Sequence, residues 1–506
     1  MASKAKAKLS LVFLLFSLVL LLSNLALATH DPERRDDEGN PEGPKRRLKE
    51  CMRQCDRREG QEQPSCRRQC RERYQREREE QEHGGRGRGE ERESNDSDEG
   101  SEREQEQGQQ ESGHPYLFED QHFTARARSQ HGRLRVLQKF TERSNLLRGI
   151  ENYRLSILEA DPQILVIPNH LDAERLLFVA RGRGTISLVH QDRRESFNLQ
   201  RGDVLRVPAG TTSYMINRDN NEKLVIAKLL QPVGVPGEFQ PFFGPGGEDP
   251  ESFYRAFSTE ILESALNTRR DKLQRLFGQQ RQGIIIKASE EQIRSMSHRE
   301  EGGRSWPFGG ESRGPFNLLN KRPSQSNQYG QLHEVDARDY RQLQDLDVAI
   351  SFANITQGSM EAPFYNSRAT KISVVVEGEG YFEMACPHLS SSESGGQGKS
   401  SPSYRRVSGR LRRGTVLVVP AGHPIVRVAS SNQNLELLCF EINARDNEKY
   451  PLAGRRNIMN QLEKEAKELA FGVPAREVEE IFRQQEEDFF FRGPGQQQQE
   501  GGRGDA

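Results

Sequence analysis

The chain has little sulfur, almost no tryptophan and almost no net charge. Its 506 residues include six cysteines, seven methionines and one tryptophan, and 74 basic residues against 75 acidic ones give a formal net charge of −1. This balance does not favour nucleic-acid binding, which normally needs a basic patch or stripe. After residue 28 no apolar run is long enough to span a bilayer. We therefore expect a main body that neither binds nucleic acid nor associates stably with membranes.

Residues 1–28 have the composition of a secretory signal peptide. Three lysines precede an apolar run over residues 9–22, and Ala-Leu-Ala at 26–28 offers a cleavage site between small residues. The mature chain is thus expected in the secretory pathway, where disulfides form. In that compartment Asn95 and Asn354, each in an Asn-x-Ser/Thr sequon, are candidate glycosylation sites.

Residues 29–112 are rich in Arg, Glu, Gln and Gly and poor in apolar residues, which predicts disorder. An island at about 45–80 is the exception, because it contains two Cys-x3-Cys pairs. Cysteines at i and i+4 share one face of a helix. Two such helices, packed antiparallel, would form the disulfides Cys51–Cys70 and Cys55–Cys66, although four cysteines allow three connectivities. Zinc binding is the alternative, which the signal peptide and the spacing disfavour.

The rest of the chain repeats one pattern. Gly-x5-Pro-Ala-Gly occurs at 202–210 and again at 414–422, each time after a strand, a glycine turn and a second strand. Each block of short alternating strands is followed by a helical section with an apolar stripe. The pattern predicts two homologous β-domains with helical arms. Their expected boundaries are 113–288 and 315–492, with a polar linker at 289–314 and a disordered tail at 493–506.

Several motifs in this order resemble the vicilin-type 7S seed storage globulins, which are bicupin proteins. Besides the repeat, they are Phe-Gln-Pro-Phe-Phe at 239–243, Asn-Leu-Leu-Asn at 317–320 and Pro-Ala-Gly-His-Pro at 420–424. The resemblance covers about residues 113–490. It implies an all-β fold with helical extensions, in which two cupin (jelly-roll-like) β-barrels are each followed by an α-helical arm. It also implies a homotrimer, held together by arms that dock on neighbouring subunits.

The chain lacks the ligands with which enzymatic cupins hold a metal, which are His-x-His, a following Glu and a later His. In the first unit these positions hold His170-Leu171-Asp172, Arg175 and Ser213, and in the second unit two of them hold Lys371 and Ile425. An isoleucine cannot ligate a metal, and a buried arginine or lysine would repel a cation. We therefore expect no enzyme activity.

A different metal site is predicted in the second unit. Cys386-Pro387-His388 places a thiol and an imidazole at i and i+2 of one strand, and His423 follows Pro-Ala-Gly near the expected barrel mouth. Such a Cys/His set suits copper or zinc. Some vicilins are similar, with a copper site that includes a tyrosine of the N-terminal arm, which would here be Tyr116. Burial of Cys386, or a disulfide with Cys439, is the alternative.

The leading hypothesis is a seed storage protein that acts as a nutrient reservoir without a required cofactor. The abundance of Arg, Gln, Glu and Asn agrees with a nitrogen reserve. The resemblance implies deposition in protein storage vacuoles, proteolysis on germination, and IgE binding in so far as family members are food allergens. One alternative is a defence precursor that releases residues 45–80 as a basic hairpin attracted to anionic membranes. A copper-binding cupin, with Cu(II) in the second barrel, is the other.

Overall fold

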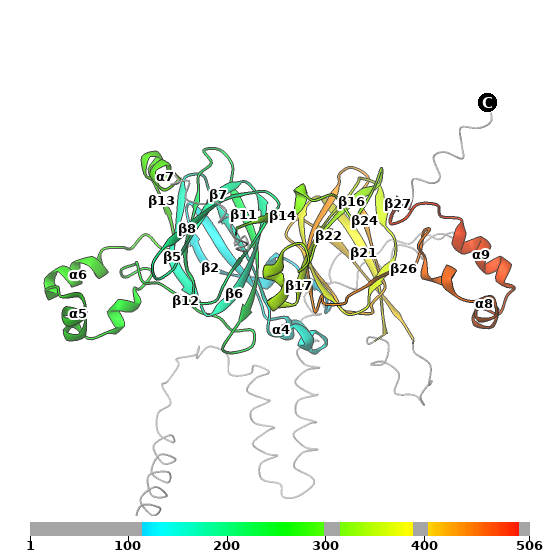
Figure 1. Ribbon diagram of the computed structural model, residues 1–506, viewed down its shortest axis with the longest axis horizontal. Coiled ribbons are helices and arrows are strands. Elements are labelled where there is room, and N and C mark those ends of the chain that lie inside the picture. Colours follow the sequence, from blue (N-terminus) through cyan, green and yellow to red (C-terminus); the bar gives the residue numbers. More distant parts are fainter. Residues whose placement is uncertain (1–113, 298–313, 388–402, 495–506) are drawn as a thin grey trace, which may run out of the picture. The chain divides into compact units, whose positions relative to one another are not determined.

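The computed structural model describes residues 114–297, 314–387 and 403–494 (Figure 1). The signal peptide, the Cys-x3-Cys hairpin, Asn95, His388 and the tail beyond residue 494 lie outside these ranges. Among the helices that are described, none is sufficiently long and apolar to cross a membrane.

The first repeat forms two antiparallel sheets that face each other. A seven-stranded sheet has the order β14-β9-β6-β11-β4-β3-β2, and a six-stranded sheet has the order β12-β5-β10-β7-β8, with β13 beside β5. The strands are β2 (Phe123–Ser129), β3 (Gly132–Leu137), β4 (Arg154–Ala160), β5 (Ile164–Leu171), β6 (Ala173–Arg181), β7 (Arg183–Val189), β8 (Arg194–Gln200), β9 (Asp203–Val207), β10 (Thr212–Asn217), β11 (Leu224–Pro232), β12 (Pro241–Phe242), β13 (Ile285–Lys287) and β14 (Phe316–Asn317).

The second repeat has the same plan. Its sheets have the orders β1-β23-β20-β25-β17-β16-β15 and β22-β21-β24-β18-β27, and β19 pairs with β24 and β26. The strands are β1 (Leu117–Phe118), β15 (Gln325–Asn327), β16 (Gly330–Val335), β17 (Val348–Ile355), β18 (Ser359–Glu361), β19 (Phe364–Asn366), β20 (Thr370–Glu377), β21 (Glu379–Cys386), β22 (Arg405–Arg412), β23 (Val416–Val419), β24 (Ile425–Ala429), β25 (Leu435–Ile442), β26 (Lys449–Pro451) and β27 (Phe490–Arg492). The repeats are thus jelly-roll-like pairs of sheets rather than closed barrels.

The repeated glycines are required by the backbone. Gly182 and Gly378, which turn the chain from a strand of one sheet into a strand of the facing sheet, have φ of 81° and 87°. A side-chain carbon at Gly378 would lie 1.7 Å from the carbonyl oxygen of Asn434. Such left-handed conformations are cheap only for glycine, so the sequence repeat reflects two identical turn geometries.

Two strands are exchanged between the repeats. β1, which precedes the first repeat, pairs with β23 of the second, and β14, which precedes the second repeat, pairs with β9 of the first. The two repeats also pack against each other, so central strands of the first repeat are apolar on both faces. In β6, Leu177 and Val179 belong to the core between its own two sheets, whereas Leu176 and Phe178 pack in the core shared with the second repeat. Phe178 stacks on Phe352 of β17, with ring centroids 5.9 Å apart.

A helical arm follows each pair of sheets (Figure 1). The first arm contains α5 (Thr259–Leu266) and α6 (Arg270–Gly278), and the second contains α8 (Lys464–Phe471) and α9 (Ala475–Arg483). The first helix of each arm ends at a left-handed residue, Asn267 or Gly472, which reverses the chain. The N-cap residue of α6 is Arg269. The expected linker starts with a helix, α7 (Glu290–Ser297), whose Ile293 is buried.

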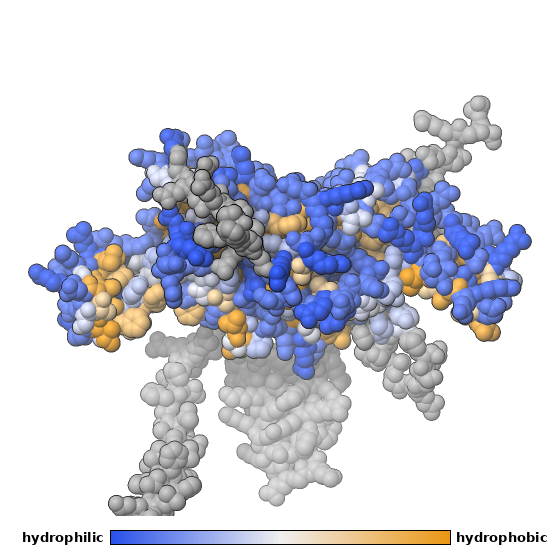
Figure 2. All heavy atoms as spheres, in the orientation of Figure 1, coloured by the Kyte–Doolittle hydropathy of each residue, from blue (hydrophilic) through white to orange (hydrophobic). Residues whose placement is uncertain are grey.

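Both arms expose apolar side chains. Figure 2 shows such side chains gathered on the two arms. The most exposed are Ile261 (57%), Leu276 (63%), Leu469 (87%) and Ile481 (62%). Hence each arm presents an apolar stripe that its own sheets do not cover.

Candidate functional site

Buried side chains of the second repeat lie in one row across neighbouring strands. Ile425 at the start of β24 pairs with Met384 of β21 on one side and with Phe364 of β19 on the other. Continuing the first register by two residues places Cys386 opposite His423, and the hydrogen bond from Ala385 N to Pro424 O (2.9 Å) agrees with it. On the other side Gly422 N donates to Asn366 O (2.8 Å), which is one residue out of the register of Phe364 with Ile425, so Asn366 lies beside the Gly422–His423 turn. Cys386, His423 and Asn366 are 0%, 4% and 2% exposed.

Tyr116 reaches this row from the exchanged N-terminal segment. Its carbonyl oxygen accepts a hydrogen bond from Val418 N (2.9 Å), which continues the pairing of β1 with β23. The Tyr116 ring is fully buried, and its centroid lies 6.0 Å from that of His423. Its hydroxyl has no hydrogen-bond partner among the described residues. The pairing of β1 with β23 therefore places Tyr116 beside His423 in the second repeat.

The row is apolar enough to keep its acidic groups protonated. Burial, and next the neighbouring Cys386, raise the pKa of Tyr116 to about 12. Burial raises the pKa of the Cys386 thiol to about 12 as well. Desolvation disfavours the charged form in both cases. Without a cation nearby, the phenol and the thiol are neutral at physiological pH.

The structure brings together three of the four predicted copper ligands, namely Tyr116, Cys386 and His423. The fourth, His388, lies outside the described residues. Cys386 and Cys439 are free thiols, so the alternative of a disulfide between them is wrong. Instead, the Cys439 sulfur lies 3.3 Å from Arg427 Nη1 and 3.2 Å from Ser373 Oγ.

The donor set fits copper chemically. A thiol and an imidazole on adjacent strands, with an unpaired phenol beside them, are ligand types that Cu(II) takes. Within residues 114–297, 314–387 and 403–494, however, no three His, Cys, Asp or Glu side chains gather closely enough to hold a metal. Among these residues Cys386 and His423 thus form only a pair, with the phenol of Tyr116 beside His423, and the copper site stays a prediction.

One of the ligand positions of enzymatic cupins holds a buried basic residue in each repeat, Arg175 in the first and Lys371 in the second. In the first repeat, Arg175 donates to Ser213 Oγ (2.9 Å) and to Thr211 O (2.8 Å). Burial lowers the pKa of Arg175 to about 10, and burial together with Arg175 lowers the pKa of Lys228 to about 7. In the second repeat, Lys371 Nζ lies 3.1 Å from Glu441 Oε1. These cations would repel a metal ion.

The glycosylation sequon at Asn354 lies on a central strand. Asn354 belongs to β17, where it pairs with β16 on one side and β25 on the other. The side chain is half-buried, and its Oδ1 has no partner among the described residues. Glycosylation of Asn354 stays a prediction.

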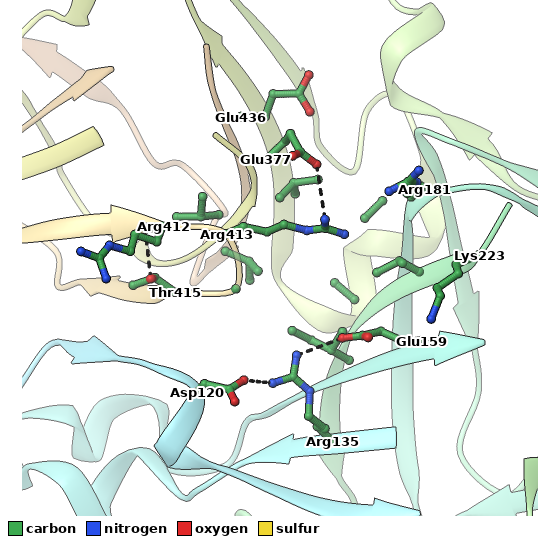
Figure 3. Close-up of a pocket in the computed structure, with 18 of the residues that line it drawn as sticks. Asp120, Arg135, Glu159, Arg181, Lys223, Glu377, Arg412, Arg413, Thr415 and Glu436 are labelled. Atoms are coloured by element: carbon green, nitrogen blue, oxygen red, sulfur yellow. Dashed lines mark hydrogen bonds and ion pairs between the residues drawn. The ribbon is translucent and has the colours of Figure 1, made fainter. Parts of the chain in front are cut away.

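A cleft of about 930 Å³ lies between the two repeats and was not foreseen from the sequence (Figure 3). Its charged groups pair with one another. Glu159 accepts from Arg135 at 3.0 Å, while Arg413 points into the cleft 3.9 Å from Glu377. Across the cleft, Arg201 of the first repeat donates to Glu436 of the second at 2.7 Å. The cleft is therefore a seam between the repeats in which several of the charged side chains are neutralised by one another.

Two facing sheets in each of two repeats define a bicupin protein, and comparison with known proteins agrees. The cupin family model matches residues 149–231 and 316–479. Vicilin Jug r 6.0101 of Juglans regia is 56% identical over 99% of each chain. The crystal structure of vicilin from Corylus avellana covers 75% of this chain and all of its own, with 58% identity and a TM-score of 0.69. The chain belongs to the vicilin family of 7S seed storage globulins.

One further relative has a name that mentions antimicrobial peptides. The chain is 51% identical to "Vicilin-like antimicrobial peptides 2-2" of Macadamia integrifolia, over 78% of its own length and 61% of the relative. That name describes the relative.

Proposed function

We propose that this chain is a non-catalytic nutrient reservoir, deposited in the storage vacuoles of seeds and degraded on germination. The observation that carries this function is the 56% identity to a vicilin over 99% of both chains. Buried cations at the positions of enzymatic cupin ligands support the absence of catalysis. Fractionation of maturing and germinating seeds with an antibody to the chain tests the proposal. We expect accumulation in vacuolar protein bodies and loss during seedling growth, whereas an even level through germination would contradict it.

We further propose that the assembled form is a homotrimer joined through the helical arms. The support is the exposed apolar stripe on each arm, which a free monomer would leave in water. Light scattering of the native protein should give three times the mass of the mature chain. The relative from Juglans regia, Jug r 6.0101, has the name of an allergen. We therefore also propose that this chain binds IgE, which sera of sensitised patients would test.

A copper site is a second candidate function of the second repeat. We propose that Cys386, His423 and Tyr116, with His388, bind Cu(II); their proximity and the unpaired phenol support it. Elemental analysis of protein purified without chelator should find copper in the wild type and much less in Cys386→Ser. Cys439→Ser is the matched control, because Cys439 is equally buried but lies in the Arg427 network. Equal copper in both variants would contradict the site.

Release of residues 45–80 as an antimicrobial hairpin is proposed from the macadamia relatives and from the basic Cys-x3-Cys sequence. The disulfides Cys51–Cys70 and Cys55–Cys66 belong to this proposal. Mass spectrometry of seed extracts should find the disulfide-linked segment free of the main body. Leakage of anionic vesicles with the purified segment then tests its activity, with neutral vesicles as the control.

A further inference from the structure

The first repeat buries a cation without the carboxylate that its counterpart in the second repeat has. Arg175 of β6 is 6% exposed and stands opposite Leu230 of β11. In the equivalent pairing of the second repeat, Lys371 of β20 stands opposite Glu441 of β25, and their charged groups lie 3.1 Å apart. A leucine thus takes the place of the counterion in the first repeat. A buried charge that lacks a counterion costs free energy.

The groups around Arg175 leave part of its guanidinium without a partner. Its two terminal nitrogens donate to the hydroxyl of Ser213 at 2.9 Å and to the carbonyl oxygen of Thr211 at 2.8 Å, which are both neutral. Its Nε is buried without a hydrogen-bond partner among the described residues. Glu174, whose charge opposes the effect of burial on the pKa of Arg175, is itself paired with Arg206 at 2.9 Å.

Lys228 faces the same interior as Arg175. It stands on β11 opposite Leu177, which lies two residues from Arg175 along β6, so both basic side chains project from one face of the sheet. Leu177 and Ile226 belong to the core between the two sheets of the first repeat, which identifies this face. Such diagonal neighbours on adjacent strands lie about 7–8 Å apart, within reach of long side chains. The amine and the guanidinium therefore share one interior site.

The amine of Lys228 is available as a nucleophile. Among the described residues it has neither a carboxylate partner nor a hydrogen-bond acceptor. Burial, and next the charge of Arg175, lower the pKa of Lys228 to about 7, so the neutral, nucleophilic amine is present near neutral pH. Lys228 is half-buried although Leu177, Ile226 and Leu230 are at most 2% exposed. There is thus room for a small molecule beside the lysine side chain.

Carbon dioxide suits both groups. It is small and uncharged, so it enters an apolar interior without the cost of desolvating a charge. The lone pair of Lys228 Nζ forms a bond to its carbon, one C=O electron pair moves onto oxygen, and one N–H proton leaves to water. Amine and CO2 thus give a carbamate and a proton. The carbamate carries the missing negative charge and can accept from Arg175 Nε, whereas an aldehyde would give an imine, which supplies no negative charge.

We propose that CO2 converts Lys228 to a carbamate, which pairs with Arg175 between the sheets of the first repeat. The second repeat has no such modification site. Cys439 stands opposite Ser373 at the place that Lys228 takes opposite Leu177. The modification is independent of the reservoir function and of metal binding in the second repeat.

Carbon NMR of the full-length protein in isotopically labelled bicarbonate, which equilibrates with CO2, tests the proposal. The wild type should show a carbamate resonance that is lost in Lys228→Met. Lys223→Met is the matched control, because Lys223 precedes the same strand but is exposed and pairs with Asp161 at 2.9 Å. Carbamates at the N-terminus and at exposed lysines contribute equally to all variants. Leu230→Glu copies the second repeat by giving Arg175 a counterion, so it should also lose most of the resonance.

A crystal of the wild type grown with bicarbonate should show density that continues from Lys228 Nζ into a planar group beside Arg175. Added CO2 at constant pH should raise the melting temperature of the wild type and not that of Lys228→Met. A carbamate resonance equally strong in Lys228→Met would overturn the proposal, and so would a separate anion that is not bonded to Nζ. An unchanged resonance in Leu230→Glu would overturn the pairing with Arg175.

Discussion

Charged residues inside the second repeat are held in pairs, and their energetics follow from burial. Arg427 makes two hydrogen bonds to Glu361, at 2.6 and 2.9 Å, and both side chains are at most 2% exposed. Glu361, and next Cys439, oppose the effect of burial and raise the pKa of Arg427. Such a pair costs free energy to desolvate, so removing one member is worse than never having had either.

Glu361→Gln should therefore destabilise the protein strongly. The variant leaves the Arg427 charge buried beside a neutral amide, and we expect a loss of about 3–5 kcal/mol in the free energy of unfolding. Urea unfolding followed by circular dichroism measures it. Glu377→Gln is the control, because Glu377 lies 3.9 Å from Arg413 with both side chains more than half exposed. Its expected effect is below about 1 kcal/mol, and similar losses in both variants would contradict the argument.

His114, on the N-terminal segment, predicts a pH dependence. Burial, and next Arg143, lower its pKa to about 4. In the unfolded chain an ordinary histidine titrates near pH 6.5. The unfolded state therefore binds the proton first, and the stability that neutral His114 contributes above pH 6.5 is lost as the pH falls towards 4, by up to about 3 kcal/mol.

His114→Gln should remove this part of the acid sensitivity. A glutamine oxygen can still accept from Tyr116 N, which donates to His114 Nδ1 at 3.3 Å, but it does not titrate. Melting temperatures between pH 7 and pH 4 should fall less in the variant than in the wild type. Parallel curves for the two proteins would show that the pKa of His114 does not differ between the folded and the unfolded state.

At the scale of elements, the helical arms are the surfaces through which we propose that the trimer assembles. Leu469 of α8 is 87% exposed, whereas Lys467 of the same helix is 3% exposed and pairs with Glu479 of α9 at 2.8 Å. The two helices of this arm are thus joined by a buried polar contact, while an apolar side chain faces solvent. That inversion of the usual pattern is expected of a helix that packs against another subunit.

Leu469→Glu should shift the protein from trimer to monomer at micromolar concentration. Burying a leucine contributes about 1.5–3 kcal/mol, and a charge there would have to be desolvated at every interface. Light scattering over a dilution series measures the shift. Lys464→Glu, a charge change at an exposed position of the same helix, should leave the trimer intact. Dissociation of both variants would point to a general charge effect.

Much of the fold could be predicted from local sequence patterns. The features that were missed depend on contacts between residues far apart in the chain. Gly182 and Gly378 could be recognised because a left-handed turn selects glycine at the residue itself. Cys386 and His423 were recognisable because their neighbours in sequence form motifs. Tyr116 could be tied to them only through the family resemblance, because its place depends on the pairing of β1 with β23, far along the chain. The seam between repeats was missed for the same reason, since its ion pairs join residues far apart in the chain.

For the whole molecule, the strand exchange predicts that the two repeats stay together after the linker is cut. A protease site placed within residues 298–313 would leave β1 on the fragment of the first repeat and β14 on the fragment of the second. Each fragment then still completes a sheet of the other. The cut protein should elute as one species in size-exclusion chromatography and separate only under denaturing conditions. Separation under native conditions would contradict a structural role of the exchange.

The same exchange makes half of this molecule an unsuitable folding unit. A single repeat produced alone would expose the backbone edge of β9 or β23 and the apolar face that contains Phe178 or Phe352. Unpaired edges and apolar faces promote association with other chains. Because both repeats belong to one chain, each finds the strand that completes it at a high effective concentration. The exchange therefore forms as an internal contact and needs no encounter between two molecules.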